Sequence, residues 1–555
     1  MNLRTHLLSL LPRPKDFTIM AKHWKGDALA GITVGVVALP LALAFGVSSG
    51  VGAAAGLVTA IIAGLVATVF GGSNLQVSGP TGAMVVIIAP LVATHGAGVV
   101  PLLSLLAGIM VILAGVLGMG RAISLIPWPV IEGFTLGIAT IIALQQVPNA
   151  LGIAAPAETN TLMAAIESFR IADWPEMSGP VLLTVATVLV IVMMTKFLPK
   201  WPASLIAVAA ATIFVVVTDL DVPLIGALPE GLPAPFVPDA NLALVYQLLP
   251  GAAAVAILAG IESLLSARVA AGMVKGGRYH PDRELVGQGL ASVASGMFGG
   301  MPATGAMART AVNIRAGGRT RLSVIVHSLF LLGVVYLASE VVSVIPLAAL
   351  AGVLLVTAFN MISFATARTI LLSTKPDALV FCVTAATTVA LDLIWAIGVG
   401  VAVTGILILR RLARQSGVFR EDSNEYRRIA ILRIDGAMFF GVSDRIESQI
   451  PEFDAVDAVI LRLSRVGIMD ATGAKALADI TIKLREAGNE VFIKGIDDSL
   501  VALIEEVGVI HTIGGREHLF TDLDAALAAA TRVVEREDKK REIAMKAFEE
   551  ADPEV

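Results

Sequence analysis

The tetrapeptide Thr-Gly-Ala-Met occurs twice, at 81–84 and at 304–307, and each copy interrupts a long apolar stretch. A Phe-Gly-Gly segment and a proline precede both copies, which begin 223 residues apart. Many transporters consist of two related halves, and Gly/Pro interruptions at corresponding points of the halves mark the binding site. The repeat therefore predicts a two-halved membrane transporter, although a chain rich in Gly and Ala can also repeat four residues by chance.

The composition of the chain agrees with a membrane protein. Hydrophobic residues make up 56% of the 555 residues and charged residues only 15%, whereas soluble proteins carry about 25% charged residues. Between 29 and 410 one apolar run follows another. Runs of about 20 residues cross a bilayer as helices, because lipid offers backbone amides no partner. The single cysteine, Cys382, excludes a disulfide framework and a cysteine-based metal site.

Fourteen membrane spans are predicted in this region. They cover 29–46, 52–70, 81–95, 99–119, 124–144, 179–196, 203–218, 250–274, 286–300, 306–316, 321–338, 342–360, 376–391 and 393–410. A copy of the tetrapeptide lies at the start of the short third and tenth spans, so a seven-plus-seven division places both copies at the same point of each half. Because the number of spans per half is odd, the halves are expected to be inverted relative to each other.

The charges in the loops indicate the orientation, because cytoplasmic loops are enriched in Lys and Arg. With the N-terminus inside, the inner loops carry the cations Arg121, Lys196, Lys200, Lys275, Arg278, Arg283, Arg315, Arg319, Arg321, Arg368 and Lys375. The outer loops carry mainly the acids Glu158, Glu167, Asp173, Glu176, Asp219, Asp221, Glu230 and Asp239. We therefore expect a multi-pass protein of the cell inner membrane with both termini in the cytoplasm.

A small α/β domain is predicted after the last span. Strand patterns at 429–434, 458–463 and 490–496 alternate with helical patterns at 472–487, 500–507 and 523–535. The expected organisation is an N-terminal segment 1–28, a membrane domain 29–410, a linker 411–425, a cytoplasmic domain 426–537 and a charged tail 538–555, as an exposed helix or a frayed end. In the turn before the first of these helices, Asp470 or Thr472 can cap the helix, and a helix N-terminus can also attract an anion.

At this point the chain resembles the SulP family of anion transporters, the relatives of sulfate permeases and prestin. The resemblance covers nearly the whole chain and rests on four segments in order. They are VSGPTG at 77–82, AGIESLLS at 259–266, GGMP at 299–302 with RTAVN at 309–313, and a C-terminal region similar to STAS domains with the turn at 470–473.

The resemblance implies a fold and a mode of action. It implies a core formed by spans 1–4 and 8–11, a gate formed by spans 5–7 and 12–14, a homodimer, and an elevator-like movement of the core. The serine that phosphorylation-switch STAS domains carry after the Asp is Ala471 here. A scaffold role, with a cytoplasmic partner of the STAS domain, is therefore the safer expectation.

By the same resemblance, an anion is held between the starts of the third and tenth helices. The candidate substrate-binding residues are Thr81, Gly82, Ala83, Thr304, Gly305, Ala306 and Arg309. Helix N-termini carry unpaired amides and a positive dipole end, and glycines let the backbone approach a ligand. Tight helix packing, which uses the same small residues, is the alternative. For Arg309 the alternative to a charge beside the anion is an arginine that reaches the cytoplasmic interface.

Glu262 is the candidate for ion coupling, because an acid inside a membrane span is costly and is a functional candidate by default. Uptake of a proton by this carboxylate would remove a negative charge beside the anion, and Ser266 lies one turn further on the same face. The alternative is a structural salt bridge with Arg268 or Arg309. Protons are favoured as the coupling ion, and sodium remains open because family members with a sodium site use an acid with nearby hydroxyls.

We therefore expect a secondary transporter of a small inorganic oxyanion, sulfate or bicarbonate, by proton symport. The alternatives are a sodium-coupled bicarbonate or dicarboxylate transporter, a passive anion channel, a nucleobase carrier of the same membrane fold, and a sensor. The sequence contains no nucleophile–base pair, metal cluster or P-loop, so we expect neither an enzyme nor a cofactor. The lipid bilayer is a partner, and no nucleic acid is expected to be one.

Overall fold

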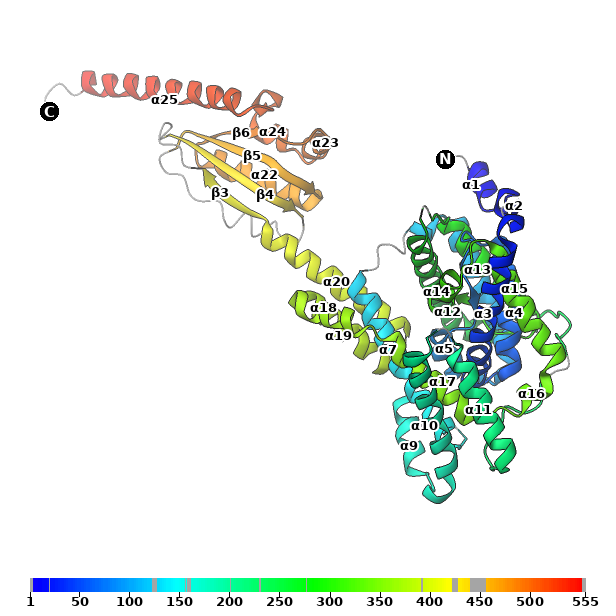
Figure 1. Cartoon of the computed structure of the whole chain (residues 1–555). Coiled ribbons are helices and arrows are strands. Elements are labelled where there is room, and N and C mark those ends of the chain that lie inside the picture. Colours follow the sequence, from blue (N-terminus) through cyan, green and yellow to red (C-terminus); the bar gives the residue numbers. More distant parts are fainter. Residues whose placement is uncertain are drawn as a thin grey trace. The chain divides into compact units, whose positions relative to one another are not determined.

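The computed structural model describes residues 3–18, 20–121, 127–154, 156, 161–199, 201–228, 231–275, 277–390, 393–421, 428–439 and 456–551. The chain divides into two compact units, Met1–Ala402 and Val403–Val555 (Figure 1). The first unit is helical apart from two short strands, and the second contains a five-stranded sheet.

Each of the fourteen predicted spans falls on a helix of its own. These helices are α3 (Met20–Ser48), α4 (Ala53–Phe70), α5 (Gly82–His95), α6 (Val100–Val116), α7 (Trp128–Gln145), α10 (Trp174–Phe197), α11 (Ala203–Thr218), α12 (Leu242–Met273), α13 (Pro281–Met297), α14 (Met307–Arg315), α15 (Arg321–Leu337), α17 (Leu347–Met361), α19 (Lys375–Ala390) and α20 (Leu393–Gln415). Residues 124–126 of the fifth predicted span and residue 391 of the thirteenth lie outside the described residues.

Shorter elements lie before and between these helices. They are α1 (Leu3–Ser9), α2 (Lys15–Thr18), α8 (Val147–Leu151), α9 (Thr161–Arg170), α16 (Ser339–Ser343), α18 (Phe364–Ser373), the 3-10 turn η1 (Ala97–Val99), and the strands β1 (Ser78–Gly79) and β2 (Thr304–Gly305). Seven helical stretches among the described residues have the length and composition to cross a membrane alone, and α5, α11 and α15 are shorter apolar helices. The protein is thus a multi-pass membrane protein.

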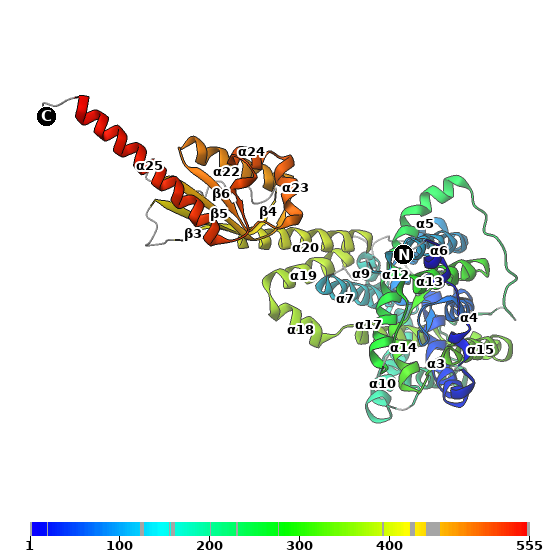
Figure 2. The ribbon, with the colours of Figure 1, turned by 90° about the horizontal axis from the view of Figure 1, so that it is seen from above.

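The two halves repeat each other's contacts. α3, the first helix of its half, packs on α15, the fourth helix of the other half. In the same way α12, the first helix of the second half, packs on α6, the fourth helix of the first. The pairs α7–α19 and α10–α17 correspond in the same way. The second helices of the two halves, α4 and α13, pack against each other beside α3 and α15 (Figures 1 and 2). The seven-plus-seven arrangement, with a core and a gate, has this pattern of contacts.

Glycines allow the closest approach of α6 and α13. A Cβ added at Gly289 would lie 2.5 Å from the carbonyl oxygen of Gly108, and one added at Gly108 would lie 2.7 Å from that of Gly289. Helices that pack inside a membrane gain mainly from such close van der Waals contact. The two backbones therefore touch at this pair, and a larger residue on either side has no room.

Substituting Gly289 with alanine is expected to lower the stability of the membrane unit by about 1–3 kcal/mol, because overpacking forces the helices apart. Helix propensity alone would raise it by about 1 kcal/mol. Gly333 in α15 provides the matched control, since a Cβ there meets nothing within 4 Å. Thermal unfolding of the detergent-solubilised protein should show a loss for Gly289→Ala and none for Gly333→Ala. Equal melting temperatures for the two variants would contradict the packing argument.

Two arginines cap the C-terminal end of α4 at one end of the core. Arg321 is 1% exposed and donates to the carbonyl oxygen of Gly71 over 2.8 Å. Arg283 donates to the carbonyl oxygen of Phe70 over 3.1 Å and to the Asp16 carboxylate over 2.7 Å. Carbonyls at a helix end have no partner within the helix, and cations are favoured there by the helix dipole. The N-terminal segment is therefore tied to the core through these arginines.

The second unit is an α/β domain. Its strands are β3 (Gly417–Glu421), β4 (Ile429–Met438), β5 (Ala458–Met469), β6 (Glu490–Lys494) and β7 (Leu519–Phe520), in the order β3-β4-β5-β6-β7, with β3 antiparallel to β4 and the remaining pairs parallel. Its helical elements are α22 (Ala471–Glu486), α23 (Asp498–Glu506), α24 (Val509–Ile513), the 3-10 turn η3 (Arg516–His518) and α25 (Leu523–Ala551). Alternate residues of β4 pack against α22, α23 and α24 on one face and against α25 on the other.

The expected linker 411–425 differs from the structure. α20 continues to Gln415, and 417–421 forms the edge strand β3, which pairs with β4. The sequence of β3 is Gly-Val-Phe-Arg-Glu and has no alternation of apolar and polar residues, so the pattern did not indicate a strand. The expected charged tail begins inside α25, which remains helical to Ala551 and extends beyond the sheet (Figure 1).

Candidate functional site

The two short strands bring the copies of the tetrapeptide together. β1 and β2 pair antiparallel, with Ser78 opposite Gly305 and Gly79 opposite Thr304. α5 begins shortly after β1, and α14 begins shortly after β2, so the N-termini of both helices lie at this ladder. The sequence did not indicate the strands, because two residues are too few to establish an alternating pattern.

The register of the ladder agrees with the sequence repeat. Its continuation by one residue would set Pro80 opposite Ala303, and these two are themselves 223 residues apart, like the two tetrapeptides. An antiparallel ladder that crosses at equivalent positions has a local two-fold axis, as inverted halves require. The crossing point is the position of Pro80 and Ala303, and both residue pairs of the described ladder lie on one side of it. On the other side Thr81 would face Pro302, which has no N–H to donate.

One helix, α12, bonds to both copies. The hydroxyl of Thr81 donates to the Glu262 carboxylate over 3.0 Å. The hydroxyl of Ser263 lies 3.1 Å from that of Thr304 and accepts from the amide of Gly305 over 3.0 Å. Adjacent residues of α12 therefore hold the two copies of the tetrapeptide. Ser263 was not among the predicted site residues, although it lies next to the intramembrane acid.

Arg309 lies behind the ladder and is buried within the membrane unit. It is 2% exposed, and its guanidinium donates to the carbonyl oxygen of Pro80. Its Nη1 is buried without a hydrogen-bond partner, and a Cβ added at Gly79 would lie 2.8 Å from it. The structure thus favours the interpretation that this charge supports the site over that of an interfacial arginine.

Glu262 is half-buried and bonds to a hydroxyl. Within the described part of the chain, the salt bridge that was its alternative is not formed: Arg268 is exposed, and Arg309 donates to the Pro80 carbonyl. A carboxylate that accepts from Thr81 can exchange its proton without breaking an ion pair. The geometry is therefore compatible with a proton-binding role.

Ser266 bonds away from Glu262. Its hydroxyl lies 3.2 Å from the hydroxyl of Thr310, which in turn accepts from the amide of Val77 over 3.0 Å. Ser266 therefore joins α12 to α14 and to the segment before β1. In this structure its hydroxyl supports the segment before the ladder, and the expected role of Ser266 in ion coupling stays a prediction.

A polar stripe on α13 holds the ladder from behind. The side-chain amide of Gln288 donates to the Ser78 hydroxyl over 2.5 Å, and the Ser292 hydroxyl accepts from the Ala303 amide over 3.2 Å. The stripe comprises Glu284, Gln288, Ser292 and Ser295, all of them at most 2% exposed. Sequence reasoning missed these residues, although polar residues spaced by one helical turn in an apolar span were a usable signal.

Neighbouring side chains occupy the space beside the glycine of each copy. A Cβ added at Gly82 would lie 2.3 Å from Cδ1 of Ile142, and one added at Gly305 would lie 1.8 Å from Nε2 of Gln76. Ala83 is fully buried. These positions therefore serve close packing, which was the alternative to a role in ligand approach.

The site is accessible from outside the protein at the first residues that follow the two strands. Thr81 is half-buried, Ala306 is 8% exposed and Met307 is 39% exposed. Thr81 and Ala306 are the N-cap residues of α5 and α14. First-turn amides of a helix have no acceptor within the helix, so two such ends form a concentration of donors at this point.

In the second unit, Asp470 caps α22 by accepting from the amide of Gly473 over 2.8 Å. Thr472 is exposed in the first turn of that helix, beside Ala471. The capping interpretation of this turn therefore accounts for Asp470.

Comparison with known proteins gives consistent matches. A model of the sulfate permease family matches residues 24–384, and a model of the STAS domain matches 422–526. The proposed sulfate transporter YvdB of Bacillus subtilis is 33% identical over 523 residues, which cover 91% of this chain and 97% of YvdB. The bicarbonate transporter BicA of Synechocystis is also 33% identical, over 89% of this chain and 92% of BicA.

Solved structures agree. The transmembrane domain of a cyanobacterial bicarbonate transporter BicA has a TM-score of 0.63 at 33% identity and covers 68% of this chain and 97% of that domain. The anion transporter Slc26a9 of the mouse has a TM-score of 0.84 over 95% of both chains; at 17% identity this shows a common fold. The family model alone spans more than half of the chain. The chain therefore belongs to the sulfate permease (SulP) family and carries a C-terminal STAS domain.

Proposed function

We propose that the protein is a secondary transporter of a small inorganic oxyanion, sulfate or bicarbonate, and that it moves the anion together with a proton. The observation that carries this proposal is the β1–β2 ladder, which sets the N-termini of α5 and α14 side by side against a half-buried acid. Relatives named for sulfate transport and for bicarbonate transport support an oxyanion as the substrate.

In the proposed anion site, the partial positive charges of two helix N-termini contribute more to anion binding than the full charge of an arginine. Each helix N-terminus acts as about half a positive charge, and its free amides bind anionic oxygens. Arg309 adds a full charge from behind the ladder, where it is 2% exposed. An anion at the open side of Thr81 and Met307 therefore meets hydrogen-bond donors without a cation directly beside it, which allows it to leave as readily as it binds.

The proposed coupling runs through Glu262 and Thr81. When the carboxylate is ionised, it accepts the hydrogen of the Thr81 hydroxyl, whose oxygen lies 3.0 Å away. When it is protonated, it can donate to Thr81, whose own hydrogen is then free for the anion. Protonation thus removes a negative charge and adds a donor at the same point. A passive channel has no need of such an acid.

The proposed movement is of the elevator type. The parts of the site are joined to one another through β1–β2, α12 and α13, so the core can shift as one body against the gate helices. We further propose cytoplasmic termini in the cell inner membrane, a homodimer, and a scaffold role for the STAS domain with a cytoplasmic partner.

Uptake of labelled sulfate and labelled bicarbonate into proteoliposomes tests the function. We expect one of the two to accumulate when the lumen is alkaline, and less so at symmetric pH. A parallel series with an inward sodium gradient separates the two coupling ions. Uptake that responds to sodium alone would replace the proton by sodium, and downhill flux that ignores both gradients would indicate a channel.

A further inference from the structure

A cavity of about 640 Å³ lies between core and gate helices, apart from the ladder. α3 and α14 of the core line one side, and α10, α11 and α17 line the other. Most of the lining is apolar, with the hydroxyls of Thr33, Thr195, Ser204 and Thr357 and the amide of Asn360 among it. Arg315 is the one charged residue among the lining residues that the structure describes.

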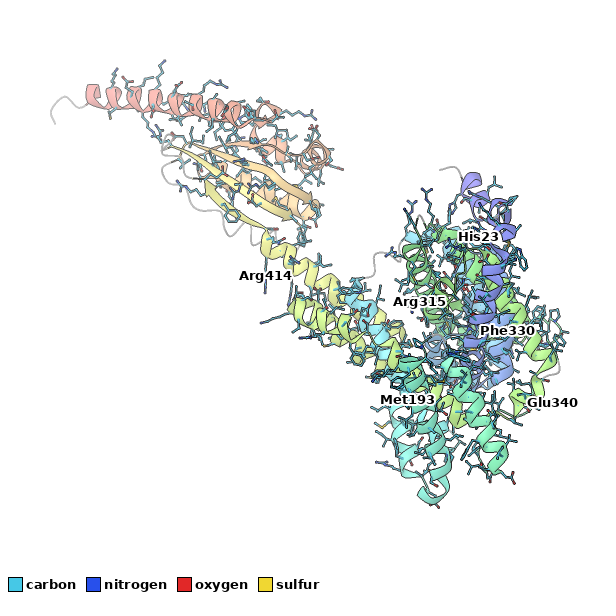
Figure 3. The ribbon with its side chains drawn as sticks, viewed as in Figure 1. His23, Met193, Arg315, Phe330, Glu340 and Arg414 are labelled. Carbon is cyan, nitrogen blue, oxygen red and sulfur yellow. The ribbon has the colours of Figure 1, made fainter. Side chains whose placement is uncertain are left out.

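The same face of α14 connects this cavity with the anion site. Val312 and Arg315 line the cavity, and Ala308, one turn before Val312, is exposed at the start of the helix. From Met307 to Arg315 the helix rises about 12 Å, at 1.5 Å per residue. Arg309, by contrast, faces the core, so the two arginines of α14 serve different spaces. Figure 3 labels Arg315 on this helix.

Arg315 is free to bind a ligand. It is exposed, and among the described residues it takes part in no ion pair. A guanidinium presents several donors in a plane, which suits the oxygens of a small oxyanion, and Asn360 adds amide donors from the opposite wall. The apolar walls have a low dielectric constant and focus the field of this single charge into the cavity.

We propose that Arg315 and Asn360 form a second anion-binding site in this cavity, which loads the central site from that face of the membrane. This inference rests on the proposed function. The Debye length is about 8 Å at physiological ionic strength, shorter than the rise along α14, so Arg315 acts on an anion in the cavity itself. Loss of this charge should therefore weaken capture from one face and leave the central site unchanged.

Trp201 lines the same cavity and can report on anions there. The chain has five tryptophans, and replacing Trp24, Trp128, Trp174 and Trp395 by phenylalanine leaves Trp201 as the only one. Iodide, an anionic quencher, is then compared with acrylamide, a neutral one. We expect Arg315→Gln to lower the iodide quenching constant at least twofold without a change in acrylamide quenching. Sulfate or bicarbonate should reduce iodide quenching in the parent and have little effect in Arg315→Gln.

Arg368 provides the control, as an exposed cation of α18 that does not line the cavity. Arg368→Gln should quench like the parent. Equal iodide quenching in Arg315→Gln and the parent would overturn the proposed site, and so would a matching change in acrylamide quenching, which indicates altered access.

Transport kinetics separate this site from the proposed function. In right-side-out and inverted membrane vesicles, Arg315→Gln should raise KM severalfold for uptake from the cavity's face only, with an unchanged maximal rate. Arg315→Lys should restore part of the loss. If the parent transports neither oxyanion while iodide quenching still depends on Arg315, the proposed function fails and the binding site stands. A KM that rises equally from both faces would overturn the loading role.

Discussion

In the Glu262→Gln variant, we expect anion uptake to continue and its response to a pH gradient to disappear. A gradient of one pH unit stores about 1.36 kcal/mol per proton, which corresponds to about tenfold accumulation of a coupled anion. Glutamine mimics the protonated acid in shape and can donate to Thr81, as the proposed coupling requires of the protonated state. The variant should therefore bind the anion and equilibrate it without accumulating it.

The measurement is labelled uptake into proteoliposomes at symmetric pH and with an alkaline lumen, taken to equilibrium. Glu132→Gln is the matched control, because Glu132 also lies on a membrane helix and accepts from the Trp128 indole over 3.2 Å. We expect Glu132→Gln to accumulate like the wild type and Glu262→Asp to retain part of the response. If Glu262→Gln accumulates the anion as fully as the wild type, proton coupling through this residue is contradicted.

Arg309→Gln should have the second large effect, a rise in KM of tenfold or more. Two losses add here. The positive charge behind the ladder disappears, and the carbonyl oxygen of Pro80 loses a charged donor in a buried place. A buried carbonyl without a partner costs about 1–3 kcal/mol of stability and loosens the ladder. A loss of about 1.4 kcal/mol in anion binding corresponds to about tenfold in affinity.

Arg309→Lys distinguishes the two losses. Lysine keeps the charge but lacks the planar fork that reaches the Pro80 carbonyl, so a largely restored KM would assign the effect to charge. A Lys variant as weak as the Gln variant would assign it to the hydrogen bond that holds the ladder. Uptake into vesicles that contain no anion, measured over a range of external anion concentrations, gives KM. Thermal unfolding of each variant checks that the membrane unit remains folded. An unchanged KM in Arg309→Gln would show that the residue is only structural.

The sequence was sufficient to predict where the helices lie, because long apolar runs with charged or Pro/Gly breaks leave few alternatives in lipid. It also located the two segments that meet, since Thr-Gly-Ala-Met recurs at equivalent points. It could not predict that they meet through a two-residue ladder, because pairing between residues more than two hundred positions apart has no local pattern. The register, with Pro80 at the crossing, is visible only in three dimensions.

Hydrogen-bond partners were the weakest part of the sequence-based interpretation. The placement of Ser266 on the face of Glu262 was reasonable from helical spacing, yet its hydroxyl found Thr310 on another helix. For Arg309, spacing gave a position one turn into the helix but could not decide between the interface and the Pro80 carbonyl. Such choices depend on which backbone groups tertiary packing leaves without partners, and these arise only once the halves are assembled.

The bracing of the ladder by α12 and α13 has a thermodynamic consequence. From α13, Gln288 holds Ser78 of β1 and Ser292 holds the residue before β2. From α12, Ser263 holds Gly305 of β2 and Glu262 holds Thr81, which follows β1. In the proposed elevator movement, a site held in this way would reach either surface of the bilayer with the same intrinsic dissociation constant. The net direction of transport would then be set by the chemical potentials of the anion and the coupled ion. Any difference between the KM for inward and for outward transport would arise in the paths that lead to the site and not in the site itself.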